Sequence, residues 1–457
     1  MSQTDRRTFL RNAGLTALAG AVASSTSLGA AEASAAAFAA DPKVGEKFDF
    51  DTPYSRVGTD CIKWDAPAKT FGRENIQVGM GIADMDFRAA PCIGKAIQDR
   101  AKHENWGYLA MPDSYVEAIV GWNKRRYNLD IDPASVVLTT GVHPGLIASL
   151  ETFAPPGTRV MLFTPTYNGF YGDLRYTHTI AEEARMLKGA DGRYSLDFDA
   201  IEKQMGNCNV AIVCNPQNPT GNVWSAEDLG RIGEIALRHK VVVLSDEIHC
   251  DFMNKGQKYT PFASLPNRDV VNNSLSFKAA SKTFSLAAWK AAWFFSTNPD
   301  YVRRVREHVR ADLTTMGVMV NQAAITEGEA WVDQLLPYID GNHELVASYA
   351  KQNWDPYIKT VKAQGTYLSW LDCTGLAQRI NTRAQAEAES KKTGKHVAPE
   401  AMLQKWFVYN AKVDLNPGNT YGAGGEDHMR MNIATSRKTL QLALDNITNA
   451  LKSKATM

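Results

Sequence analysis

The sequence lacks several features that would place it quickly in a class of protein. Its 457 residues carry a formal net charge of only +1, so it has no strong basic field with which to bind nucleic acid. Its six cysteines form no Cys-x-x-Cys or Cys/His cluster of the metal-binding type. Gly141 and Gly145 do not fit the G-x-G-x-x-G spacing of a dinucleotide site. Beyond residue 40, no apolar run is long enough to suggest a transmembrane helix.

The first forty residues differ in composition from the rest of the chain. Arg6 and Arg7 precede a Thr-Phe-Leu triplet, and a weakly apolar stretch follows from residue 13 to residue 23. This pattern is typical of a signal peptide with a twin-arginine address. The apolar stretch is short and rich in Gly, Ser and Thr, so we expect no stable membrane anchor.

The twin-arginine route exports proteins that are already folded. Residues 1–40 therefore predict that the protein contacts this export machinery and ends in the periplasm or outside the cell. Cleavage after Ala35 and cleavage at Ala39 or Ala40 both remain open. An exported protein can form disulfides. Yet Cys214 and Cys250 lie in apolar stretches, where a free buried thiol is the commoner state, so we expect few disulfides or none.

Four continuous apolar runs, rich in β-branched residues, are typical of buried central strands. They are residues 136–141, 159–165, 210–216 and 241–247. Residues 225–240 are amphipathic, and we predict a helix there, with Ser225 as its cap and Asp228 in its first turn. Alternating strands and helices predict an α/β fold with a mainly parallel sheet.

The two ends of the chain flank this α/β region and predict a second, smaller unit. The C-terminal part contains a strand-like stretch at 365–372 and an amphipathic stretch at 438–452. Residues 377–400 are polar and rich in lysine, and we expect a solvated helix–loop insert. The predicted boundaries are 1–40 for the signal peptide, 88–334 for a large domain, and 41–87 with 335–457 for a small domain.

Residues that carry chemistry follow the ends of the predicted strands, where open α/β sheets bind ligands. TTGVHPG, TPTYNGF, CNPQNPTG and SDEIHCDF follow the four strands in turn, and KAASKTF comes next. A pyridoxal phosphate site needs a lysine for a Schiff base, a carboxylate for the ring nitrogen and an aromatic ring that stacks. It also needs a phosphate cradle at a helix N-terminus and a cation for the substrate carboxylate. Every part is present.

The ordered set NPQNPTG, SDEIH and SKTF resembles the fold-type I pyridoxal phosphate enzymes of the class I/II aminotransferase family. The resemblance implies a large domain with a mainly parallel seven-stranded sheet and a smaller α/β domain built from both chain ends. Within the family, the chain is most similar to the bacterial cystathionine β-lyase, or C–S lyase, branch, over nearly all of its mature length. The segments that carry this likeness are 56–65, 83–93, 106–115, 366–372, 416–422 and 429–432.

The resemblance implies a role for particular residues. Lys282 forms the Schiff base and moves the substrate proton, Asp246 pairs with the ring nitrogen, and Arg430 binds the substrate carboxylate. Tyr108 reaches the phosphate of a neighbouring subunit, which implies a homodimer with shared sites. The remaining implied cofactor contacts are Asn218 and His249 at the ring oxygen, Tyr167 stacked on the ring, and Gly141 and Val142 at the phosphate.

Simpler structural roles remain open for several of these residues. Tyr367, a candidate substrate contact, either lines the pocket or belongs to the core, and the same holds for Trp106 and His143. Five more residues have a plain structural reading: a turn cap for Asp246, a core histidine for His249, packing for Tyr167 and Ser281, and a surface ion pair for Arg430.

Three positions depart from the family pattern. Ala279 stands where a phosphate-binding serine is usual, and Ser285 stands where the C–S lyase branch has asparagine. Lys290 replaces an arginine, which exchanges a planar fork for a point charge. We therefore expect a phosphate grip that is weaker, or one rebuilt from Lys290, Ser281 and Tyr108.

Two reactions remain open once Lys282 has removed the α-proton of an amino acid: transamination and β-elimination of a group such as a thiol. The C–S lyase likeness favours elimination. The breadth of the family, the changed lysine segment and the expected export favour transamination, which we take as the leading interpretation. The substrate is then an amino acid, or the amino-acid part of a larger metabolite such as a siderophore precursor. A cofactor-binding protein without catalysis is the most remote interpretation.

Overall fold

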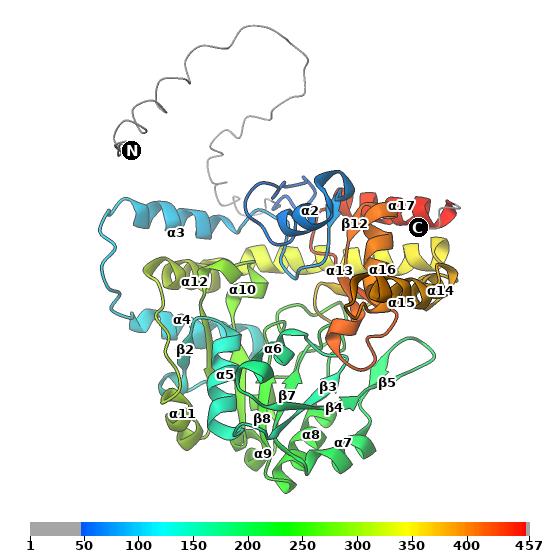
Figure 1. The fold of residues 1–457 in the computed structure, drawn as a ribbon. Helices are drawn as coiled ribbons and strands as arrows, with labels where there is room; N and C mark the ends of the chain where they lie inside the picture. Colours follow the sequence, from blue (N-terminus) through cyan, green and yellow to red (C-terminus); the bar gives the residue numbers. More distant parts are fainter. Residues whose placement is uncertain (1–46, 454–457) are drawn as a thin grey trace, which may run out of the picture. The chain divides into compact units, whose positions relative to one another are not determined.

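A seven-stranded sheet forms the centre of the computed structural model, which describes residues 47–453 (Figure 1). Its strand order is β2-β10-β9-β8-β7-β3-β4, and every pairing is parallel except those that β10 makes with β2 and β9. The mainly parallel α/β sheet predicted from the sequence is confirmed. The strands are β2 (Val137–Thr139), β3 (Arg159–Thr164), β4 (Ile180–Arg185), β7 (Cys208–Cys214), β8 (Val242–Asp246), β9 (Ser274–Lys278) and β10 (Ala292–Phe295).

Alternating side chains of these strands fill a core on each face of the sheet. On β3, Val160 and Leu162 belong to one buried cluster, whereas Met161 and Phe163 belong to another. Because both faces are covered, the strands are apolar along their whole length rather than at every second residue. Helices α5 (Val142–Phe153), α6 (Gly169–Tyr176) and α11 (Pro299–Arg306) supply the first cluster, and α7 (Phe198–Met205), α8 (Ala226–Arg238) and α9 (Arg268–Asn272) supply the second.

Helix α8 begins as its sequence predicts. The Ser225 hydroxyl accepts a hydrogen bond from the Asp228 backbone N–H at 3.0 Å, and the Asp228 carboxylate accepts from the Ser225 backbone N–H at 3.3 Å. This reciprocal capping satisfies two backbone donors that a helix start otherwise leaves unpaired.

Strands from both ends of the chain meet beside the main sheet. β1 (Val78–Gly79) pairs in parallel with β12 (Val413–Asp414), and β11 (Leu368–Asp372), β14 (His428–Asn432) and β13 (Asn416–Pro417) form an antiparallel sheet. The hairpin β5 (Leu187–Lys188) and β6 (Tyr194–Ser195) stands apart from both. The remaining helices are α2 (Asp65–Phe71), α3 (Pro91–Ala101), α4 (Asp113–Tyr127), α10 (Ala280–Thr283), α12 (Thr315–Glu327), α13 (Glu329–Asn353), α14 (Thr374–Arg379), α15 (Thr382–Thr393), α16 (Pro399–Trp406) and α17 (Arg437–Lys452).

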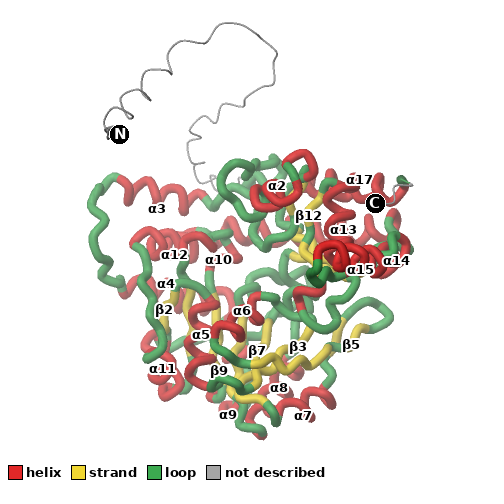
Figure 2. The backbone as a smooth tube through the Cα atoms, in the orientation of Figure 1, coloured by secondary structure: helices red, strands yellow, loops and turns green. Residues whose placement is uncertain are grey.

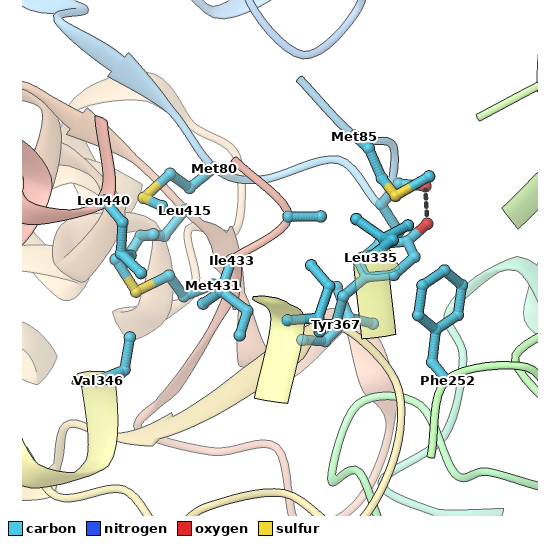
Figure 3. Packing of buried hydrophobic residues seen from close by; sticks show 14 of the residues in the cluster. Met80, Met85, Phe252, Leu335, Val346, Tyr367, Leu415, Met431, Ile433 and Leu440 are labelled. Carbon is cyan, nitrogen blue, oxygen red and sulfur yellow. Dashed lines mark hydrogen bonds between the residues drawn. The ribbon is translucent and has the colours of Figure 1, made fainter. Parts of the chain in front are cut away.

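Figure 2 shows helices around these short strands, whereas the yellow strands of the main sheet lie side by side. A buried cluster joins the two regions. Met80 from the N-terminal segment packs with Met431 and Leu440, and Phe252 packs against the ring of Tyr367 at a centroid distance of 4.7 Å (Figure 3). The N-terminal segment is therefore fixed between residues that come from far later in the chain.

The predicted signal peptide, residues 1–40, lies outside the described residues, and the boundaries of the large and small domains stay a prediction. Within residues 47–453, no helix combines the length and the apolar character that crossing a bilayer requires. The six cysteines all fall in this range; each is buried, and no two of them form a disulfide.

Candidate active site

A cavity of about 210 Å³ lies at the carboxyl ends of the central strands. Many of the residues singled out in the sequence line it together: Gly141, Val142, Tyr167, Asn218, Asp246, His249, Ser281, Lys282 and Lys290. Parallel pairing explains this convergence, because the register that aligns Cys214 with Asp246 brings the ends of β7 and β8 to one edge of the sheet.

Lys282 lies on the short helix α10, and its amine donates a hydrogen bond to the Ala83 carbonyl at 2.8 Å. Burial, together with the positive charge of Arg430, lowers the pKa of the Lys282 amine to about 8. A larger share of the amine is therefore neutral near pH 7 than for an exposed lysine, and the neutral form is the nucleophile and the base.

Asp246 is the last residue of β8 and is buried. Burial raises the pKa of its carboxyl to about 6, although the backbone N–H of Ile248, which donates to Oδ1 at 3.1 Å, opposes that shift. The charges of His143 and Lys282 oppose it as well. A buried carboxylate of this kind is stabilised by a cationic partner, such as a protonated ring nitrogen.

His249 provides a direct test of whether the site fits a cofactor. The residue is buried, it lines the cavity, and its Nδ1 has no hydrogen-bond partner among the described residues. Burial lowers the pKa of His249 well below its ordinary value, so the imidazole is neutral. Buried polar atoms are rarely left unpaired, so this nitrogen fits a ligand atom in the cavity.

Arg430, on β14, is buried beside the cavity and is not among its lining residues. Its Nη1 donates to Asn218 Oδ1 at 3.1 Å, its Nη2 donates to the Gly81 carbonyl at 2.8 Å, and its Nε has no partner within residues 47–453. The guanidinium lies over the Tyr421 ring at 5.1 Å. Arg430 is therefore no surface ion pair, and its role as the fork that binds the substrate carboxylate stays a prediction.

The backbone from Gly81 to Met85 is held by side chains of the site. The Tyr367 hydroxyl donates to the Ala83 carbonyl at 3.0 Å, the hydrogen bond drawn in Figure 3. The Asn432 amide donates to the carbonyls on either side of Ala83, at 2.6 and 2.5 Å. Tyr367 is fully buried in the core and is not among the residues that line the cavity, and its hydroxyl orients the carbonyl that faces Lys282. A direct contact of Tyr367 with the substrate stays a prediction.

His143 and Asp173 form a pair that the sequence did not predict. The Nδ1 of His143 lies 2.7 and 2.9 Å from the two carboxylate oxygens of Asp173, and its Nε2 lies 3.3 Å from the Tyr167 hydroxyl. The sequence left His143 between pocket and core, and the structure places it in the cavity wall. Asp173 carries no sequence signal, because its approach to His143 depends on how α6 packs against α5.

Tyr108 and Trp106 do not reach the cavity of their own chain. Both are exposed in the loop between α3 and α4, and Tyr108 is exposed completely. The role of Tyr108 at a neighbouring subunit stays a prediction. Ala279 is buried, and Lys290 is exposed at the rim of the cavity with a left-handed backbone, φ +50°.

A larger cavity, of about 1140 Å³, lies between the β5–β6 hairpin and α13. Two of its lysines are already paired with carboxylates: Lys188 with Asp372 at 2.7 Å and Lys362 with Asp340 at 2.9 Å. Neither Lys282 nor Asp246 lines it, so it does not compete as the site of the chemistry.

The residues of the smaller cavity fit pyridoxal phosphate. Lys282 would bind it covalently, Asp246 would face the ring nitrogen, and His249 with Asn218 would face the ring oxygen. The backbone N–H groups of Gly141, the N-cap of α5, and of Val142, its first residue, would bind the phosphate, because a helix start leaves its first donors without partners inside the helix.

Comparison with known proteins agrees with this chemistry. The family model of aminotransferase class I and II matches residues 75–447. Cystathionine β-lyase PatB of Bacillus subtilis strain 168 is 33% identical over 416 residues, which cover 88% of this chain and 100% of the relative. A PLP-bound protein of Clostridium difficile 630 has 29% identity and a TM-score of 0.80, covering 89% of this chain and 100% of that one. Cystalysin of Treponema denticola, which contains pyridoxal 5′-phosphate, has 27% identity and a TM-score of 0.79, covering 89% and 99%.

Proposed function

We propose that this chain, which belongs to the aminotransferase class I and II family, breaks the carbon–sulfur bond of an amino-acid substrate by β-elimination. It is a pyridoxal phosphate-dependent enzyme, and the cofactor, when bound, supplies an acceptor for the electron pair that the substrate α-carbon releases. The observation that carries the choice of reaction is the likeness to cystathionine β-lyase, which spans the whole length of that relative.

The site residues divide the work of the reaction among them. Arg430 binds the substrate carboxylate through its guanidinium fork, which orients the α-hydrogen. The Lys282 amine takes that proton, and the Ala83 carbonyl, itself fixed by Tyr367, holds the amine in place. Asp246 keeps a proton on the ring nitrogen, because its buried carboxylate is stabilised by the positive charge there.

Elimination then depends on the group carried by the β-carbon. A thiolate leaves readily as an anion, so a thioether amino acid such as L-cystathionine suits the site. With water, L-cystathionine gives homocysteine, pyruvate and ammonia, and the proton that Lys282 has taken can return to the leaving sulfur.

Transamination, the leading interpretation from the sequence alone, is the second candidate. The family as a whole is named for it, and the same three residues, Lys282, Asp246 and Arg430, begin both reactions. The named relatives support elimination better, so we place transamination second.

Incubating the purified protein with L-cystathionine separates the two reactions. We expect free thiol and pyruvate in equal amounts, with the cofactor unchanged. Formation of pyridoxamine phosphate without free thiol would instead establish transamination. Lys282→Ala is the control and should give neither product, because it lacks both the covalent attachment and the base.

We also propose that residues 1–40 direct export through the twin-arginine route, on the basis of Arg6 and Arg7 before the apolar stretch. Changing both Arg6 and Arg7 to lysine keeps the positive charge, and it should leave the protein in the cytoplasmic fraction of an expressing bacterium. Equal amounts of both forms in the periplasmic fraction would refute this route.

A further inference from the structure

Two side chains of the cavity wall, His143 and Tyr167, form a connected set with Asp173, which does not line the cavity. His143 comes from the first turn of α5, Tyr167 from the loop that precedes α6, and Asp173 from α6 itself. The Asp173 carboxylate lies within hydrogen-bond distance of His143 Nδ1 through both oxygens, at 2.7 and 2.9 Å. The second ring nitrogen, Nε2, lies 3.3 Å from the Tyr167 hydroxyl. Asp173, His143 and Tyr167 therefore form a chain of polar contacts that ends in the cavity.

Gly169 shows how closely the two rings are packed. A Cβ atom at this position would lie 2.5 Å from Tyr167 Cε1 and 2.6 Å from His143 Cε1, closer than side-chain carbons approach one another. The ring centroids of His143 and Tyr167 are 5.5 Å apart with an interplanar angle of 39°, and Phe170 meets the Tyr167 ring edge-on at 5.4 Å. The backbone at the start of α6 and the two neighbouring rings thus leave the Tyr167 ring little freedom.

The Asp173 carboxylate determines which ring nitrogen of His143 carries a proton. Asp173 is buried, and an acceptor-only carboxylate at Nδ1 requires that this nitrogen carry a proton. Burial opposes the charged imidazolium, but the Asp173 hydrogen bond and charge outweigh it and raise the pKa of His143. Asp246 acts in the same direction and Lys282 against it. Nε2 is consequently free to bond the Tyr167 hydroxyl, as a donor or as an acceptor.

We propose that His143 and Asp173 are positioning residues for Tyr167, which hold its ring in the orientation that packs against the bound cofactor. A phenylalanine-like contact alone would not need a buried carboxylate nearby, because the Asp173 carboxylate loses its hydration there. The inference requires only that pyridoxal phosphate binds in this cavity, so it holds for elimination and for transamination alike. A failure here therefore leaves the proposed reaction standing.

The main test is a double-mutant cycle on cofactor binding to the full-length apoprotein. His143→Gln, Tyr167→Phe and the double variant are titrated with pyridoxal phosphate, and the visible circular dichroism of the bound cofactor is recorded. We expect each single change to weaken binding about fivefold, the loss of one hydrogen bond. The double variant should bind no more weakly than His143→Gln alone, because both changes break the same contact. The dichroic band should shrink in all three variants.

Asp173→Asn tests the other half of the set without removing a ring. Histidine resonances of the apoprotein should show one imidazole whose pKa falls by about one unit or more, since an opposite charge at this distance is lost. The same variant should reduce the dichroic band. It also carries the test if His143→Gln does not fold.

His239→Gln is the matched control, because His239 pairs with Glu202 at 2.9 Å and does not line the cavity. It should leave cofactor affinity and dichroism unchanged. Fold-losses that multiply in the His143→Gln/Tyr167→Phe variant would overturn the proposal. So would a dichroic band that His143→Gln and Asp173→Asn leave at its wild-type size.

Discussion

The Lys282 amine is the residue whose environment changes its chemistry most directly. Its pKa is lowered to about 8, so below that pH the neutral fraction of the amine rises about tenfold for each pH unit. We expect the rate at which the apoprotein captures pyridoxal phosphate to rise with pH in the same way and to level off above pH 8. Stopped-flow absorbance of the cofactor measures this rate. A rate that continues to rise to pH 10 would mean that the amine has the pKa of an exposed lysine.

The shape of the Arg430 side chain matters as well as its charge. Arg430→Lys keeps the charge but loses the fork, whose two branches now reach Asn218 and the Gly81 carbonyl. We expect KM for L-cystathionine to rise by roughly tenfold or more, the loss of one charge-assisted hydrogen bond. The change in kcat should be smaller, because Lys282 and its base function are untouched. Steady-state kinetics of the two proteins, compared at one pH, provide the check.

Whether the sequence predicts a residue's place in the site depends on the position of that residue relative to the strands. Asp246 ends a strand, and Asn218 and Lys282 follow strands within a few residues. Parallel strands bring such residues to one edge of a sheet, so the sequence alone places them together. Asp173 follows no strand, and its contact with His143 arises from the packing of α6 on α5. No local pattern records that kind of contact, so the pair became visible only in three dimensions.

At the scale of elements, the N-terminal segment is held by a buried ion pair. Lys63 Nζ lies 2.7 Å from Asp86 Oδ2 and donates to the Asp84 carbonyl at 3.0 Å, and the side chains of Lys63 and Asp86 are both buried. We expect Lys63→Met to lower the free energy of unfolding by about 3 kcal/mol, because it leaves the Asp86 charge without its closest partner. Denaturant unfolding of the apoprotein gives the value.

The matched control is Lys391→Met on α15, which removes an exposed lysine paired with Glu387 at 2.6 Å. Exposed pairs contribute about 0.5 kcal/mol, so the control should unfold almost as the wild type does. Equal effects of the two changes would mean that burial adds nothing to the Lys63–Asp86 pair.

The sequence predicts long elements better than short pairings. The four predicted strands and the helix at 225–240 all appear, with ends shifted by one or two residues, because apolar runs and caps are local signals. The pairing of β1 with β12 joins residues more than three hundred positions apart through strands of two residues each, which have no periodicity to detect. The sequence predicts a solvated helix–loop insert at 377–400, and this range contains α15, with a short loop on each side of it.

At the scale of the whole molecule, the exposed Tyr108 predicts that one chain does not complete a site alone. If Tyr108 serves the partner's cofactor, mixing Lys282→Ala with Tyr108→Ala chains creates one intact site in every mixed dimer. Random mixing should then restore about a quarter of the wild-type activity, even though the Lys282→Ala protein is inactive. Denaturing, mixing and refolding the two proteins, followed by an activity assay, measures the recovery.

Lys282→Ala mixed with Asp246→Ala is the control for that experiment. Both residues line the same cavity within one chain, so no combination of the two proteins contains an intact site. No recovery beyond this control in the Tyr108 mixture would show that Tyr108 has no role across the subunit boundary.

The buried cysteines have a consequence for how the folded protein meets its surroundings. Burial raises the pKa of Cys208 and Cys250 to about 12, and it holds the pKa of Cys214 and Cys373 well above the ordinary value. A thiol reacts as its thiolate, so these side chains are unreactive for two reasons: reagents do not reach them, and they stay protonated. Coloured disulfide reagents should leave the native protein unlabelled and modify it only as it opens. Every molecule thus carries its own reporter of unfolding, one that needs no attached dye.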